Sequence, residues 1–341
     1  MRIVFNPAQA GHAPEFEFFR GKKVPCFETP ARFEIIREAI AREGWAMEAA
    51  RPFPDAALRK VHEARYLDFL EGAWAEWEAC GNEGDAFPCV WPVRGMRTEL
   101  TPENFAARLG LFSFDTGSPL AAGTWQAARA GADCALSAAQ ALIAGEPSAF
   151  ALTRPPGHHA GASFFGGYCF LNNAAIAAQA LREAGAARVA ILDVDYHHGN
   201  GTQDIFYSRG DVFFASLHGD PRTEYPFFLG HADERGTGAG EGCNLNLPLP
   251  ADASTPDWFA ALDTALAAIR RFSPEALVVS LGVDAFAGDP ISKFRLQTAD
   301  FSRLGVRLRQ AALPTLFVLE GGYAVEEIGA NIVSTLRPFA A

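Results

Sequence analysis

Ile191-Leu192-Asp193-Val194-Asp195-Tyr196-His197-His198-Gly199-Asn200-Gly201 changes from an apolar run to a polar loop within a few residues. Side chains alternate between the two faces of an extended strand, so Asp193, Asp195 and His197 project to one side. A carboxylate and an imidazole two residues apart can hold one cation. The spacing predicts a metal site where a buried strand ends, whereas each acid taken alone could merely cap a helix.

Further apolar, β-branched segments are typical of strands buried on both faces of a parallel sheet. They are Ser148–Leu152, Arg188–Leu192, Val212–Ser216, Ala276–Leu281 and Pro314–Leu319. Alanine-rich stretches with helical periodicity alternate with them, at Thr124–Ala144, Asn172–Ala184 and Asp257–Arg271. This alternation predicts a doubly wound α/β fold. Residues 79–118 form the least regular stretch, too long for an ordinary connection, and we expect a functional loop or an interface there.

The composition predicts a soluble, cytoplasmic protein. Of the 341 residues 49% are hydrophobic and 20% are charged, and there is no uninterrupted apolar run of about 18 residues that could span a bilayer. The six cysteines lack C-x-x-C spacing, which predicts free thiols. The formal charge of −11 argues against nucleic acid as a partner and favours a cationic ligand.

Three more polar segments follow predicted strands. They are Arg154–Ala160 with two adjacent histidines, Leu281–Phe286 with Asp284, and Leu319–Tyr323 with a Gly-Gly-Tyr turn. Ligands of open α/β sheets bind beyond the carboxyl ends of the strands, so these segments should converge. Asp195, His197 and Asp284 would leave a coordination position open, as catalytic zinc does. In isolation the histidines could be a surface pair and Asp284 a helix cap.

Taken together, these segments resemble the arginase-deacetylase superfamily, and within it the histone deacetylase-like amidohydrolases, most closely the bacterial acetylpolyamine amidohydrolases. The likeness extends to Val61–Glu63, Gly117–Trp125, Ser216–Asp220 and Gly236–Pro248. It implies one domain over residues 1–341 with an eight-stranded parallel sheet flanked by helices. It also implies hydrolysis of acetylated polyamines or diamines, such as acetylputrescine or acetylcadaverine, to acetate and free amine.

The resemblance also implies roles for individual residues. It implies one zinc ion per chain, with the ligands Asp195, His197 and Asp284. The implied catalytic set is His159 as general base and then acid, the pair His158 and Asp193, Tyr323 as donor to the oxyanion, and Asn200. Histone-type enzymes often carry Asp at the position of Asn200, so an amide there should favour a neutral base. Structural potassium is implied at Asp193, Asp195, His197, Ser216 and Leu217, and a second ion near Phe206, Arg209 and Val212.

The resemblance further predicts an entrance loop and dimerisation element at about 79–118, in a homodimer that admits a slender cationic acyl-amine. Tyr168 and Tyr225 should line the channel as aromatic walls, although Tyr225 could equally serve packing. Asp115 and Glu103 are the nearest candidates for the acid that meets the distal ammonium.

Other functions compete with this interpretation. The same chemistry could serve a protein acetyl-lysine deacetylase of the histone type, and the fold could belong to a catalytically idle binding or sensor protein. A two-manganese arginase would carry extra carboxylates, whereas Phe286 and Gly199 stand near the metal-binding segments here. We therefore expect one catalytic metal.

Overall fold

The central sheet has eight strands, and every neighbouring pair runs parallel. The computed structural model describes residues 1–340. Across the sheet the order is β4 (Glu48–Ala49), β1 (Arg2–Phe5), β5 (Ser148–Ala151), β10 (Thr315–Leu319), β9 (Ala276–Leu281), β6 (Val189–Asp193), β7 (Val212–Gly219) and β8 (Asn244–Leu249). The five predicted strands are confirmed within a few residues. β1, β4 and β8 are additional, and β8 is an edge strand that tolerates Pro248.

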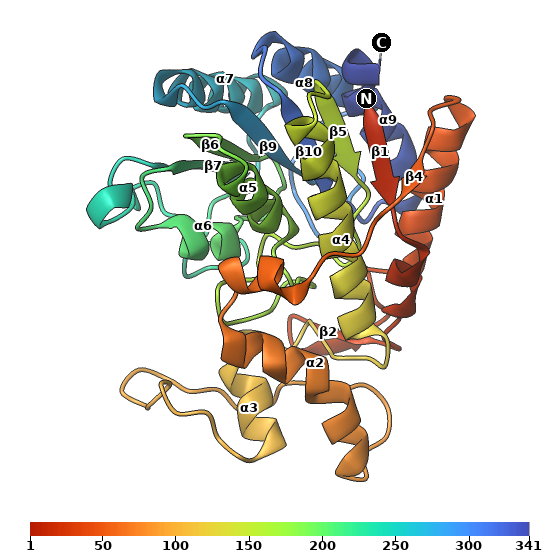
Figure 1. The fold of residues 1–341 in the computed structure, drawn as a ribbon, viewed down its shortest axis with the longest axis vertical. Coiled ribbons are helices and arrows are strands. Elements are labelled where there is room, and N and C mark those ends of the chain that lie inside the picture. Colours follow the sequence, from red (N-terminus) through yellow and green to blue (C-terminus); the bar gives the residue numbers. More distant parts are fainter. Residues whose placement is uncertain (341) are drawn as a thin grey trace.

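Helices cover both faces of the sheet (Figure 1). One face packs against α4 (Thr124–Ile143) and α5 (Asn173–Glu183), and the other against α1 (Pro30–Arg42), α7 (Thr255–Phe272), α8 (Thr298–Gln310) and α9 (Val325–Ala340). β6 shows how the sequence produces two cores. Val189 and Ile191 pack in the first, while Ala190 and Leu192 pack in the second, because side chains alternate along a strand. The chain is therefore a single α/β domain of the predicted class.

Shorter elements surround the edge of the sheet where the polar segments emerge. They are α2 (Ala64–Ala79), α3 (Phe105–Leu111), α6 (Asn200–Phe206), the antiparallel hairpin of β2 (Glu17–Phe19) and β3 (Lys22–Val24), and the 3₁₀ turns η1 (Pro7–Gly11), η2 (Asp55–Lys60) and η3 (Gly238–Gly240). Within residues 1–340 no helix has both the length and the apolar character needed to cross a membrane.

Helix α3 lies within residues 79–118, the least regular stretch of the sequence. The Asn104 side chain accepts a hydrogen bond from the Ala107 amide and caps the helix, while Phe105 and Leu109 are buried. Seven residues are too few to show a clear helical period, which is why the sequence did not predict this element.

Candidate active site

Asp195, His197 and Asp284 meet because β6 and β9 are neighbours in the sheet. Their register pairs Asp193 with Ser280, so the loops that follow leave the sheet side by side. His197 Nδ1 lies 3.0 Å from Asp284 Oδ2 and 3.4 Å from Asp195 Oδ1. One ligand atom from each residue lies within 4.8 Å of the others. The three side chains that were expected to converge therefore do so.

Two buried carboxylates in contact need a compensating positive charge. Asp195 and Asp284 are both fully buried. Burial and the charge of Asp195 raise the pKa of Asp284 well above its usual range. Burial also opposes ionisation of Asp195, but His158 and His197 outweigh it and hold the pKa of Asp195 below its usual range. A divalent cation would neutralise both carboxylates at once, and this donor set with an open position suits catalytic zinc.

The two adjacent histidines have different partners. His158 Nδ1 lies 2.9 Å from Asp193 Oδ2, while His159 Nδ1 lies 2.6 Å from Asn200 Oδ1. Asn200 Nδ2 faces the His159 carbonyl, so its oxygen is turned to the imidazole and accepts the Nδ1 proton. That tautomer leaves His159 Nε2 with a lone pair.

Their pKa values move apart accordingly. Burial, together with the nearby His158 and His197, lowers the pKa of His159 well below its usual range. Burial acts the same way on His158, but the carboxylates of Asp193 and Asp195 outweigh it and raise the pKa of His158 to about 10. A neutral imidazole thus stands beside a charged one.

Hydrogen bonds of Asp289 and Arg32 with the backbone fix the loop that carries Tyr323. Its backbone amide donates to Asp289 Oδ2 at 2.7 Å. Buried Arg32 donates to the carbonyls of Gly322 and Glu320, and its guanidinium lies 4.9 Å from the Tyr323 ring centroid. Burial raises the pKa of Tyr323 well above its usual range, so the hydroxyl stays protonated and available as a donor.

A cavity of about 420 Å³ opens over these groups, within the usual size for a small-molecule site. It is lined by His159, His197 and Tyr323, and by the predicted wall residues Tyr168 and Tyr225. The Tyr225 ring lies 5.1 Å from the His159 ring, edge to face, and the Tyr168 ring lies 5.6 Å from the Tyr323 ring. Of the other predicted catalytic residues, His158, Asp193 and Asn200 are buried and do not line the cavity.

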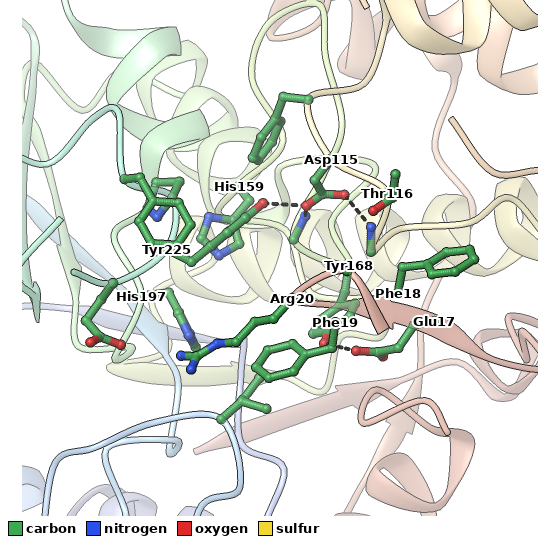
Figure 2. A pocket seen from close by; sticks show the side chains of 18 of the residues that line it. Glu17, Phe18, Phe19, Arg20, Asp115, Thr116, His159, Tyr168, His197 and Tyr225 are labelled. Carbon is green, nitrogen blue, oxygen red and sulfur yellow. Dashed lines mark hydrogen bonds between the residues drawn. The ribbon is translucent and has the colours of Figure 1, made fainter. Parts of the chain in front are cut away.

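Asp115 lines the cavity, whereas Glu103 is exposed and does not line it. Asp115 Oδ2 accepts hydrogen bonds from the Tyr225 hydroxyl at 2.6 Å and from the Gly167 amide at 2.8 Å (Figure 2). Glu103 precedes α3 and does not line the cavity, so Asp115 is the better placed of the two candidates. Tyr225 combines both expected roles, since it lines the cavity and fixes Asp115.

Sequence reasoning missed the β2–β3 hairpin, which contributes Glu17, Phe18, Phe19 and Arg20 to the cavity. The Tyr168 hydroxyl donates to Glu17 Oε1 at 2.7 Å, also drawn in Figure 2. The local signal was weak, because Gly21 fits a two-residue turn but Arg20 is not a usual first residue of one, and Lys22 and Lys23 are not typical strand formers. Nothing local indicated that the hairpin would fold against residues 100 to 200 positions away.

The residues expected to hold potassium form two groups, one that shares Asp195 and His197 with the metal cluster and one near the start of β7. Asp193 and Ser216 are paired in register on β6 and β7, and both are buried. Phe206 and Val212 are buried near the start of β7, while the Arg209 side chain pairs with Asp211. Both ion sites stay predictions.

Comparison with known proteins places this geometry in a family. The histone deacetylase domain matches residues 26–338. The chain is 52% identical to acetylpolyamine amidohydrolase 1 of Pseudomonas aeruginosa over 99% of both chains, and 46% identical to acetylpolyamine amidohydrolase of Mycoplana ramosa over the whole of both. The crystal structure of acetylpolyamine aminohydrolase from Burkholderia pseudomallei superposes with a TM-score of 0.95 at 41% identity, covering 100% of this chain and 99% of that one. The chain therefore belongs to the histone deacetylase family of hydrolases.

Proposed function

We propose that this protein hydrolyses the amide of acetylated polyamines and diamines, such as acetylputrescine or acetylcadaverine, to acetate and the free amine. The observation that carries the proposal is one cavity lined by the neutral His159, by buried Tyr323 and by His197, which belongs to the Asp195–His197–Asp284 cluster. Relatives named as acetylpolyamine amidohydrolases match the whole chain at about half identity, which supports this substrate class.

Asp195, His197 and Asp284 would hold one zinc ion. When bound, zinc supplies a Lewis acid that polarises the amide carbonyl and makes water a better nucleophile near neutral pH. The two carboxylates are already oriented for this, since Asp195 Oδ2 accepts from the Gly321 amide and Asp284 Oδ1 from the Tyr196 amide. These amides fix one oxygen of each carboxylate.

His159 takes the proton from the attacking water. Its Nε2 carries the lone pair, because Nδ1 donates to Asn200. A carboxylate at position 200 would favour the protonated ring, whereas the amide leaves it ready to accept. The same imidazole then returns the proton to the departing amine, while His158, paired with Asp193, stays charged beside it.

The Tyr323 hydroxyl donates to the carbonyl oxygen as negative charge develops there. Arg32 and Asp289 hold the loop that carries Tyr323, so the hydroxyl is positioned before the substrate arrives. Preorganisation of this kind stabilises the transition state more than the ground state.

The cavity suits a slender cationic chain. Aromatic walls from Tyr168 and Tyr225 contact methylene groups, while Asp115 and Glu17 supply acidic groups for the distal ammonium. Phe228 also lines the cavity and is 88% exposed, so it offers a further apolar contact to such a chain.

The loop between α2 and α3 would form the homodimer contact. Val90, Val93, Met96 and Leu100 are all more than half exposed there. Such apolar exposure on one segment marks an interaction surface, and a second copy of this chain would cover it.

Metal analysis of the purified protein should find about one zinc ion per chain. Chelation should abolish hydrolysis of acetylputrescine, and added Zn²⁺ should restore it. Asp284→Asn removes one buried carboxylate and should lower the metal content. Asp263→Asn is the matched control, because Asp263 is half exposed and forms a surface ion pair with Arg307. Two catalytic metal ions per chain would contradict the proposed single-metal site.

Tyr323→Phe should lower kcat on acetylcadaverine by about 10²- to 10³-fold, because one oxyanion donor is lost. KM should change little, since the hydroxyl acts mainly in the transition state. Steady-state kinetics on the zinc-loaded variant measures both constants. An unchanged kcat would remove Tyr323 from the mechanism.

The attraction between Glu17 and the distal ammonium group of the substrate should increase as pH rises through about 7. Burial, with the charges of Glu28 and Asp115, raises the pKa of Glu17 to about 7 despite hydrogen bonds from Tyr168 and Phe27. A carboxyl group is charged only above its pKa, so the kcat/KM ratio of acetylcadaverine to uncharged N-pentylacetamide should rise about threefold between pH 6 and 8.

Protein groups whose titration changes kcat/KM equally for both substrates do not affect this ratio. Glu17→Gln should make it low and independent of pH. A flat ratio in the unmodified protein would contradict a role for Glu17.

A substrate panel tests the proposed function directly. We expect kcat/KM on acetylputrescine or acetylcadaverine to exceed that on an acetyl-lysine peptide by about tenfold or more, because the peptide lacks the distal ammonium. A peptide hydrolysed better than both diamines would establish the histone-type alternative.

A further inference from the structure

Arg20 occupies a turn position that its backbone does not favour. β2 and β3 are joined by Arg20-Gly21 alone, and both residues have positive φ, +50° and +76°. Two-residue hairpin turns of this kind favour Asn, Asp or Gly at the first position, because these residues adopt the left-handed conformation with least strain. An arginine there suggests that its side chain contributes something beyond the turn.

Local contacts do not account for the arginine. Its guanidinium lies 5.2 Å from the Phe19 ring centroid, and the residue is exposed, where a cation–π contact is weak. The stacking partner is the adjacent residue of the same hairpin, so the contact fixes nothing else in the fold.

The position of the guanidinium offers a functional explanation. Arg20 lines the same cavity as Asp115 and His197, and in Figure 2 its side chain reaches over the cavity from the hairpin. The three carboxylates that line the cavity have other partners, with Glu17 bound by Tyr168, Asp115 by Tyr225, and Glu224 by Lys293. Within residues 1–340 the Arg20 guanidinium has no hydrogen-bond or ion-pair partner, and it shares the cavity with these acidic groups.

We propose that Arg20 binds a carboxylate at the distal end of the substrate, so that the cavity accepts free ω-acetylated α-amino acids as well as acetylated diamines. Such a molecule presents an ammonium group to Asp115 and Glu17 and a carboxylate to Arg20 at the same end. Guanidinium binds carboxylate through two parallel hydrogen bonds, which an ammonium group cannot form. The proposal rests on the proposed amide hydrolysis and specifies its substrate class.

The effect of the substrate carboxylate can be measured with two substrates, because N-acetylcadaverine differs from Nε-acetyl-L-lysine only in lacking that carboxylate. We would measure kcat/KM on both with zinc-loaded wild-type protein, Arg20→Asn and Arg20→Lys. Arg20→Asn should lower the value for Nε-acetyl-L-lysine about tenfold, and should leave that for acetylcadaverine unchanged or slightly higher because a repelling charge is gone. Arg20→Lys keeps the positive charge but loses the paired donors, so its kcat/KM on Nε-acetyl-L-lysine should lie between those of the wild type and Arg20→Asn.

Two controls separate recognition from folding. Asn suits the left-handed turn better than Arg, so the Tm of Arg20→Asn should equal or exceed that of the wild type. Nε-acetyl-L-lysine amide keeps the ammonium and the size but lacks the negative charge, and its hydrolysis should not fall in Arg20→Asn.

The outcomes distinguish the two levels of the proposal. Wild-type protein that hydrolyses acetylcadaverine but not Nε-acetyl-L-lysine would overturn the role of Arg20 and leave the proposed function intact. Equal losses on both substrates in Arg20→Asn would also overturn it. Hydrolysis of neither substrate by wild-type protein would overturn the proposed function itself.

Discussion

The contact between Asp195 and Asp284 is the constraint on which the rest of the site depends. Burying one carboxylate without a partner is costly, and burying two side by side costs more because like charges repel. The fold tolerates this only by surrounding the pair with donors and positive charge. Backbone amides of Gly321 and Tyr196 each bind one carboxylate oxygen, and His197 lies between the two acids. A bound divalent cation would complete the compensation.

This close contact restricts the neighbouring backbone as well. A Cβ at Gly282 would lie 2.1 Å from Asp195 Oδ2, and a Cβ at Gly321 would lie 2.6 Å from the same atom. Both glycines follow buried strands, β9 and β10, that flank the site. Two of the strand ends that deliver functional residues thus also need glycine, which explains why short Gly-containing turns accompany the polar residues in the sequence.

The inner part of this site could be predicted because its determinants are local. A strand buried on both faces is apolar throughout, so a carboxylate directly after it is conspicuous, as at Asp195 and Asp284. Parallel strands end on one edge, which brings such residues together whatever their separation along the chain. β1, β4 and β8 were missed because they are short or lie towards the sheet edges, where the apolar pattern is weaker.

The rim could not be predicted in the same way, because it is assembled from contacts between loops. Glu17 meets Tyr168, and Asp115 meets Tyr225, across separations of 151 and 110 residues. No periodicity connects such pairs. Asp115 was identified only as the nearest acid, and Glu103, equally plausible in the sequence, lies outside.

The two adjacent histidines show why inner geometry and function are tied together. They are identical in type and neighbours in sequence, yet a carboxylate at Asp193 favours the charged form of one, while the amide of Asn200 leaves the other neutral. Environments that push two pKa values apart assign different roles to like groups. Because Asp193 ends β6 and Asn200 begins α6, a single strand–loop–helix segment supplies both partners. The same segment carries Asp195 and His197, so one piece of backbone positions the proposed metal ligands together with the partners of both histidines.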